Sequence, residues 1–240
     1  MTDNSEKFPA IIELNVGGRF FTTTLLTLTK CSDNMLSAMF SGKYSVIKDK
    51  DGRYFIDADG EHFIHILNYL RYGDLPPVEI AETVYREAAY FGVHGLVSQL
   101  EKFPQILAKI QRNNFRKLFN GYSECLNSII KTAGEETLSQ TSVVKVLIFA
   151  KENDTPHEDF NLDHTCTCLD IGENLKTADS SIGPWKIETT EKDVLNCLMF
   201  DLQKQGFTVT SRFHGPCTYK IETIQCRKSF YSISFHWWRT

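Results

Sequence analysis

One group of side chains has the chemistry of a metal site: a histidine followed closely by two cysteines, His164, Cys166 and Cys168. Imidazole nitrogen and thiolate sulfur are ligands that zinc prefers, and a structural zinc site needs four of them. The spacing is unusual, because paired cysteines in zinc sites are commonly separated by two to four residues. A second ligand pair would have to come from Cys217 and Cys226 through folding.

A simpler interpretation of this cluster needs no metal. Alternation along a strand would point Cys166 and Cys168 to the same face, as a hydrophobic core also requires. The chain has seven cysteines at irregular spacings and a polar N-terminus that does not resemble a signal peptide, a combination typical of reduced thiols in a cytoplasmic protein. We therefore predict reduced thiols, no metal and no cofactor, and leave the role of the cluster open.

No arrangement of residues points to catalysis. The seven histidines and the many carboxylates form no nucleophile elbow, no zinc-protease motif and no acid pair. Cys125 shares a helix with Asn127 and Ser128 and has no neighbour in the sequence that would activate its thiol. Gly17-Gly18 lacks the context of a phosphate-binding loop and leads into a strand, so a hairpin turn explains it better. We expect a protein that is not an enzyme.

Composition narrows the classes of partner. The net charge of −4 and the isoelectric point near 6.0 favour neither nucleic acid nor an anionic membrane as a partner. The longest apolar runs, such as residues 146–150, have the length of a strand, so we expect no direct membrane insertion. With 42% apolar and 23% charged residues, the chain has the composition of a folded protein with one large domain or two small ones.

The first hundred residues combine short strands and amphipathic helices. Apolar alternation predicts strands at residues 8–16 and 19–25, joined by the turn at Gly17-Gly18. The helical period predicts later helices that end at Gly73 and Gly92, where glycine accepts the left-handed conformation of a helix end. The remaining expected elements are helices at 27–30 and 34–41, the second capped by Ser32 or Asp33, a strand at 54–56, and a last helix at 95–103.

A second pattern begins after Pro104. Residues 105–142 are predicted to be a helical connector, and residues 143–240 a smaller, antiparallel α+β domain with a helix that ends at Gly206. In the last strand, Tyr231, Ile233 and Phe235 alternate with polar residues, which predicts one buried face. The expected strands of this domain are 143–149, 208–213, 219–224 and 230–237, with a polar loop at 153–156.

The chain's three tryptophans are candidates for partner contacts, because tryptophan is enriched in interface hot spots. Trp237 and Trp238 must point to opposite sides of the last strand, and Trp237 is in phase with Phe235. We therefore predict that Trp238 is the exposed one and name Trp185 and Trp238 as contact candidates. Core packing is the alternative explanation for two or more of the three.

Five blocks of the first unit carry a family resemblance. Residues 12–18, followed by Phe21-Thr22-Thr23, resemble the opening of BTB/POZ domains of the potassium channel tetramerisation type. The blocks at 35–42, 52–60, 63–75 and 85–91 resemble the helix, strand and two further helices that follow in that domain. The second half is similar to one branch of the KCTD family, that of members seven and fourteen, at Gly183-Pro184-Trp185 and Phe235-His236-Trp237-Trp238.

The resemblance implies an N-terminal BTB/POZ (T1-like) domain at residues 8–104 that forms a ring, with a pentamer favoured over a tetramer. It also implies an adaptor whose BTB domain binds Cullin-3 while the C-terminal domain holds a protein substrate. A cullin-independent scaffold or auxiliary subunit of a membrane protein or channel is the alternative. Interface zinc of the channel type is not implied, since His94 has no adjacent cysteines. The candidate cullin contacts are Met39, Phe40, Tyr44, Tyr72 and Leu75.

Overall fold

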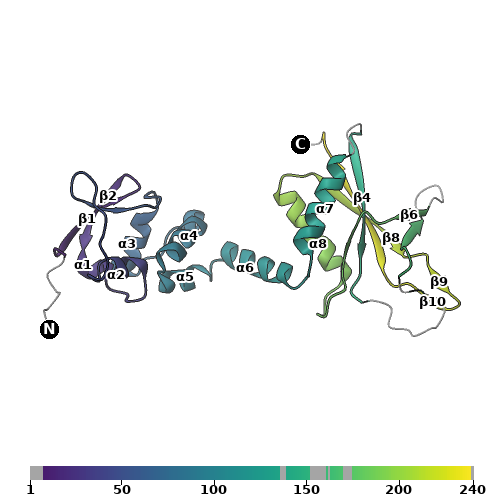
Figure 1. Cartoon of the computed structure of the whole chain (residues 1–240), viewed down its shortest axis with the longest axis horizontal. Helices are drawn as coiled ribbons and strands as arrows, with labels where there is room; N and C mark the ends of the chain where they lie inside the picture. Colours follow the sequence, from purple (N-terminus) through teal and green to yellow (C-terminus); the bar gives the residue numbers. More distant parts are fainter. Residues whose placement is uncertain (1–7, 136–138, 152–160, 162, 170–174, 239–240) are drawn as a thin grey trace. The chain divides into compact units, whose positions relative to one another are not determined.

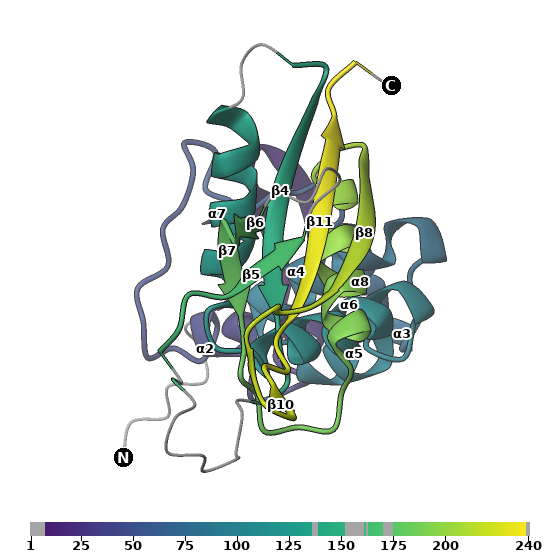
Figure 2. The ribbon, with the colours of Figure 1, turned by 90° about the vertical axis from the view of Figure 1, so that its right-hand side faces the viewer.

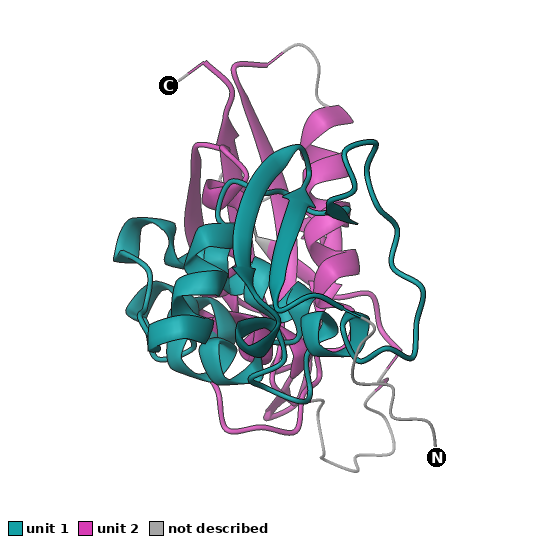
Figure 3. Cartoon of the chain, turned by 90° about the vertical axis from the view of Figure 1, so that its left-hand side faces the viewer, with its two compact units in different colours: residues 1–111 teal, residues 112–240 magenta. Residues whose placement is uncertain are grey.

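The computed structural model describes residues 8–135, 139–151, 161, 163–169 and 175–238. The chain forms two compact units, residues 1–111 and 112–240, which are coloured separately in Figure 3. Each unit combines helices with a β-sheet (Figure 1), which confirms the predicted α+β class. The polar loop predicted at 153–156 lies outside the described residues.

The sheet of the first unit is built on the predicted hairpin. Strands β1 (Ile11–Val16) and β2 (Arg19–Thr24) pair antiparallel, and β3 (Tyr54–Ile56) lies parallel to β1 on its other side. Gly17 and Gly18 connect the hairpin with φ angles of 53° and 91°, the left-handed region that a two-residue hairpin turn requires. The turn predicted for these glycines is therefore confirmed.

The helices of the first unit share one hydrophobic core with this sheet. Their apolar residues recur at the helical period, and Gly73 and Gly92 end two of them in the left-handed conformation, as predicted. The cap of the helix after residue 33 differs from the prediction, because Asn34 rather than Ser32 or Asp33 accepts the Ser37 N–H. The helices are α1 (Leu25–Leu28), α2 (Met35–Met39), α3 (Phe63–Tyr72), the 3-10 turn η1 (Val78–Ile80), α4 (Ala81–Phe91) and α5 (His94–Leu100).

The predicted connector is not a separate region. Helix α6 (Pro104–Lys117) crosses the boundary between the units, and α7 (Tyr122–Glu135) belongs to the core of the second unit. The reason is the apolar stripe of α7, which buries Ile129 and Ala133 completely. The second unit therefore begins near residue 112 rather than 143 and is not the smaller of the two.

The second unit is built around a four-stranded sheet of order β7-β4-β11-β8 (Figure 2). All its pairs are antiparallel except β4–β7, which is parallel and departs from the purely antiparallel sheet expected. Helix α7 and helix α8 (Glu191–Lys204), which is followed by Gly206 at a φ of 94° as predicted, pack with one face of the sheet. The strands are β4 (Thr141–Ile148), β7 (Ser180–Ile182), β8 (Val209–Pro216) and β11 (Ser229–His236).

A second, smaller core covers the opposite face of this sheet. Two short hairpins contribute to it, β5 (Thr167–Leu169) with β6 (Leu175–Thr177) and β9 (Lys220–Ile221) with β10 (Ile224–Gln225). The prediction of one buried face for the last strand is therefore wrong, because β11 is one of the two inner strands of a sheet covered on both sides. The fully or nearly buried members of the small core are Leu147, Phe149, Cys168, Cys217, Cys226 and Phe230.

Helix α8 begins with side-chain hydrogen bonds whose contribution to stability can be measured. Thr190 accepts the Asp193 N–H through its hydroxyl, and Asp193 Oδ2 accepts the Thr190 N–H at 3.1 Å, which together form a capping box. Thr190→Ala is expected to lower the free energy of unfolding by about 1 kcal/mol, measured by urea denaturation at pH 7. The matched control Asn196→Ala, at an exposed position inside the same helix, is expected to leave it unchanged within about 0.5 kcal/mol.

The same capping box makes part of the stability depend on pH. Hydrogen bonds from Thr190 lower the pKa of Asp193 below its usual value. A carboxyl group whose pKa is lowered by folding stabilises the fold above its unfolded pKa, and this contribution disappears as the pH falls through the folded pKa. The difference between wild type and Thr190→Ala is therefore expected to shrink when the denaturation is repeated at about pH 3. An equal difference at both pH values would contradict the capping box.

Candidate functional site

The candidate contact residues of the first unit differ in their exposure. Tyr44, Tyr72 and Leu75 expose 61%, 73% and 45% of their surface. Met39 is half-buried against the core, and Phe40 is buried. The Phe40 ring packs edge-on against the rings of Phe8 and Tyr54 at centroid distances of 5.1 and 5.2 Å. Burial therefore argues against a contact role for Phe40, while the other four residues stay candidates.

Tyr72 and Leu75 lie at the end of α3, and this end is held firmly. Tyr72 is the last helical residue rather than part of a loop, and its side chain is exposed because the apolar stripe of α3 faces the other way. Lys30 Nζ donates to the carbonyl oxygens of Leu70 and Arg71, at 2.8 and 3.3 Å. Arg71 in turn donates to the Thr22 carbonyl at 3.0 Å. An exposed aromatic side chain on a fixed helix end is a preorganised contact point.

The first unit exposes further large apolar residues that sequence patterns did not single out. Val78 lies in η1 near Leu75, and Ile47 lies in the same loop as Tyr44. Neither belongs to a periodic stripe, so no sequence signal separated them from core residues. Among the described residues, no ring contact or hydrogen bond joins Tyr44 to Tyr72. The further exposed apolar residues of this unit are Ile11, Phe20, Leu26, Ile64, Tyr90 and Leu107.

The tryptophans of the second unit separate into core and surface. Trp185 is buried, packs edge-on against Phe119 at 5.3 Å and is therefore a core residue rather than a free contact point. Trp237 stacks on Phe235 at 5.5 Å and donates its indole N–H to Ser142 Oγ at 2.7 Å. Trp238 exposes 75% of its surface, which confirms the prediction that it is the outlying one.

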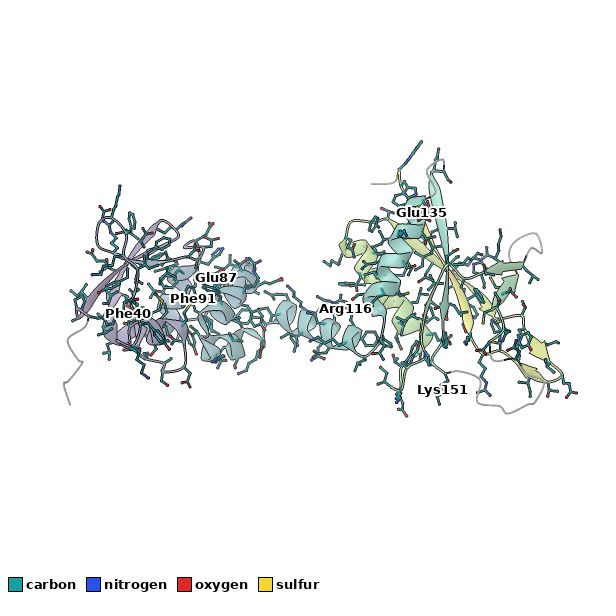
Figure 4. All side chains as sticks on the ribbon, in the orientation of Figure 1. Phe40, Glu87, Phe91, Arg116, Glu135 and Lys151 are labelled. Atoms are coloured by element: carbon teal, nitrogen blue, oxygen red, sulfur yellow. The ribbon has the colours of Figure 1, made fainter. Side chains whose placement is uncertain are left out.

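A polar network that no sequence motif indicated joins three helices within the second unit. Arg116, near the end of α6, forms a two-pronged ion pair with Asp201 on α8, with 2.7 Å from Nε to Oδ2. Tyr122, at the start of α7, donates its hydroxyl to the same Oδ2 at 2.9 Å. Figure 4 labels Arg116 near the end of α6. A fork-shaped guanidinium and a planar carboxylate fit each other in this way, so the network fixes the three helices together.

The electrostatics of this network favour a structural role. The Asp201 carboxylate raises the pKa of Arg116 above its usual value, and burial raises that of Tyr122. Burial also raises the pKa of Cys125 and Cys197, so both thiols stay protonated near neutral pH. A protonated thiol is a poor nucleophile. Neither cysteine therefore has the environment of a catalytic residue.

The cysteine–histidine cluster in the structure differs in membership from the one that is adjacent in the sequence. The structure brings His164 and Cys166 together with Cys217 and Cys226, and the ligand atoms of these four residues lie within 4.8 Å of one another. Cys168, the third residue of the sequence cluster, lies in the small core outside this group. The second pair that a metal site would require from elsewhere in the chain is therefore present.

Comparison with known proteins divides the chain at the same place as the structure. The BTB/POZ domain family matches residues 12–100, and the KCTD C-terminal domain family matches residues 110–237. BTB/POZ domain-containing protein KCTD14 of Homo sapiens is 35% identical over 231 residues, which are 95% of this chain and 87% of that protein.

Two further relatives are similar over a shorter part of the chain. BTB/POZ domain-containing protein KCTD21 of Homo sapiens is 44% identical over 105 residues, 42% of this chain and 40% of that protein. FH protein interacting protein FIP2 of Arabidopsis thaliana is 43% identical over 98 residues, 39% of this chain and 33% of that protein. Within the described residues, no helix has the length and apolar character needed to cross a membrane.

Proposed function

Because this chain belongs to the KCTD family of BTB/POZ proteins, we propose that it recruits a protein substrate to a Cullin-3 ubiquitin ligase. Membership of the family makes it an adaptor-type protein that acts through protein partners. In the proposal, the first unit binds both other copies of the chain and the cullin, and the second unit binds the substrate in the cytoplasm.

The observation that carries the proposal is the exposed apolar surface at the end of α3. Tyr72, Leu75 and Val78 expose about half of their surface or more within seven residues of sequence. Exposed apolar residues gathered in this way are typical of protein-binding surfaces. The hydrogen bonds from Lys30 to the Leu70 carbonyl and from Arg71 to the Thr22 carbonyl fix the last turn of α3, which lowers the entropy lost when a partner binds there.

Self-assembly gives the proposed adaptor its affinity for substrate. Each copy of a ring would present one Trp238, and several weak sites on one particle raise the effective concentration of every further contact. The proposal favours a pentamer over a tetramer. Light scattering on the full chain of 27.5 kDa tests this through the mass of the particle. A monomer at high protein concentration would remove the avidity from the proposal.

The cullin contact is tested with a pair of variants in different units. Tyr72→Ala removes a large exposed side chain from the proposed contact and is expected to weaken binding of the full chain to the N-terminal region of Cullin-3 by about 30-fold, because a hot-spot aromatic contributes about 2 kcal/mol. Trp238→Ala, in the second unit, is expected to leave this affinity unchanged. Binding is measured by calorimetry or surface plasmon resonance.

The outcomes separate the proposal from its alternative. If wild-type protein fails to bind the cullin region at micromolar concentration, the chain is a cullin-independent scaffold or an auxiliary subunit of a membrane protein or channel. Proximity labelling in cells then identifies the partner of the second unit. Under the proposal, Trp238→Ala loses labelled partners that Tyr72→Ala keeps, because the two side chains serve different contacts.

A further inference from the structure

Four ligand atoms from two distant segments surround one point in the second unit. His164 Nε2 lies 3.5 Å from the sulfur atoms of both Cys166 and Cys217, and the sulfur atoms of Cys166 and Cys226 lie 4.0 Å apart. The whole set spans less than 4.8 Å. Cys217 and Cys226 are buried, whereas His164 and Cys166 are half-buried at the edge of the small core.

Three of these separations are close to the edges of a zinc tetrahedron, and the others do not exceed 4.8 Å. With Zn–S bonds of about 2.3 Å and Zn–N bonds of about 2.0–2.1 Å, a tetrahedral site places its sulfur atoms about 3.8 Å apart and its nitrogen about 3.6 Å from each sulfur. The observed values of 3.5 and 4.0 Å fall within a few tenths of an ångström of these edges. Four ligands with no open position are typical of a structural rather than a catalytic zinc site.

The histidine is oriented as a metal ligand requires. His164 Nδ1 lies 2.7 Å from the carbonyl oxygen of Asn161, and a carbonyl can only accept, so Nδ1 carries the proton. Nε2 then presents its lone pair toward the sulfur atoms. The ring also stacks on Tyr219 at 3.9 Å, and the Tyr219 hydroxyl accepts the Asn161 N–H at 3.1 Å. Metal-binding histidines commonly donate their other nitrogen to a backbone carbonyl in this way.

The backbone brings Cys166 beside the pair Cys217 and Cys226. Cys217 and Cys226 lie on opposite arms of the β9–β10 hairpin, since the Cys226 N–H donates to the Tyr219 carbonyl at 2.9 Å. The Thr218 N–H donates to the Thr167 carbonyl at 2.9 Å, which places Cys166 beside Cys217. The Tyr219 N–H also donates to Cys217 Sγ at 3.4 Å.

We propose that His164, Cys166, Cys217 and Cys226 bind one structural zinc ion. The ion ties the segment before β5 to the β9–β10 hairpin and so holds both onto the far face of the sheet. Such support is needed, because strands β9 and β10 have two residues each and a two-stranded hairpin is marginally stable in water. The site is separate from the proposed cullin surface, and its test does not depend on that function.

Two other roles for the cluster fit the structure less well. A nucleophilic cysteine must be accessible to a substrate, whereas Cys217 and Cys226 are buried and Cys166 is half-buried. A disulfide between Cys166 and Cys226 would require the sulfur atoms to approach from 4.0 Å to about 2.05 Å. It would also leave the oriented histidine and the third cysteine without a role.

The test measures metal bound to the full-length chain, purified with a reducing agent and without chelator. Elemental analysis is expected to find one zinc per chain. Cobalt added to the chelator-treated protein is expected to reach one equivalent, with the charge-transfer and d–d absorption bands of a tetrahedral site with three sulfur ligands. Cys226→Ser is expected to lower metal affinity more than about 100-fold, since even the loss of a supporting hydrogen bond lowers it 10- to 100-fold.

Two further kinds of variant keep the proposal falsifiable if Cys226→Ser does not fold. His164→Cys exchanges one zinc ligand for another, so it is expected to bind one cobalt with d–d bands moved to longer wavelength. Cys168→Ala and Cys31→Ser change cysteines outside the four ligands and are expected to keep one zinc per chain. Zinc content near zero with no cobalt bands, a Cys166–Cys226 disulfide in fresh protein, or an unshifted His164→Cys spectrum would each overturn the proposal.

Discussion

Gly17→Ala is expected to destabilise the first unit by about 2–5 kcal/mol, a large share of the stability of a typical domain. A Cβ atom at this position would lie 2.2 Å from the Ala58 carbonyl oxygen, a backbone atom that cannot rotate away. The Gly17 N–H also donates to the Ile56 carbonyl at 3.1 Å. This bond ties the hairpin turn to the segment that contains Ala58, so the turn cannot move away from the clash without breaking it. Steric overlap of about 1–3 kcal/mol adds to about 1–2 kcal/mol for a left-handed alanine.

The neighbouring glycine is the matched control. Gly18 also has a positive φ, but a Cβ atom there meets nothing within 4 Å. Gly18→Ala is therefore expected to carry only the left-handed strain, about 1–2 kcal/mol. Because all three tryptophans belong to the second unit, the measurement for the first unit is urea denaturation followed by far-ultraviolet circular dichroism. Equal losses for the two variants would show that the Ala58 contact does not matter.

The second large effect is expected at Asp201, the shared acceptor of the network between α6, α7 and α8. Asp201→Ala leaves the half-buried Arg116 guanidinium and the buried Tyr122 hydroxyl without their common partner. Breaking a buried ion pair by removal of one partner lowers stability by about 3–5 kcal/mol, and partial exposure of Arg116 places this pair near the lower end. Tryptophan fluorescence during denaturation follows this loss, since it reports the second unit alone.

Two comparisons show whether the loss comes from the network. Glu188→Gln changes an exposed carboxyl group of the same unit and is expected to alter stability by less than about 0.5 kcal/mol. Adding Arg116→Met to Asp201→Ala removes the stranded charge, so the double variant is expected to be more stable than Asp201→Ala alone. Additive losses in the double variant would mean that the two side chains act independently.

Local patterns in the sequence were sufficient to predict much of the first unit. The hairpin at Gly17-Gly18 and the helix ends at Gly73 and Gly92 depend on neighbouring residues only, and the structure confirms them. The cap at Asn34 was missed because Ser32, Asp33 and Asn34 are all suitable capping residues, and the choice between them depends on backbone angles that composition does not give.

Contacts between residues that are far apart in the sequence could not be predicted from these local patterns. Helix α7 has an amphipathic sequence, which fits a helix of a connector as well as a helix of a domain core. The sequence does not show that its apolar side packs against β4. Cys166 and Cys226 are sixty residues apart, and their proximity follows from the sheet topology. The same holds for Arg116 and Asp201, whose pairing requires α6 and α8 to be adjacent.

The position of β11 in its sheet has a consequence for synthesis of the protein. β11 pairs with both β4 and β8, so neither neighbour has its central partner until residue 236 has left the ribosome. The first unit contains all its own strands and can fold while the second is still being made. A chain cut short before residue 229 would keep a folded first unit but expose two long strand edges, and such edges promote aggregation. Premature stop codons in this region are therefore expected to produce insoluble protein rather than a functional fragment.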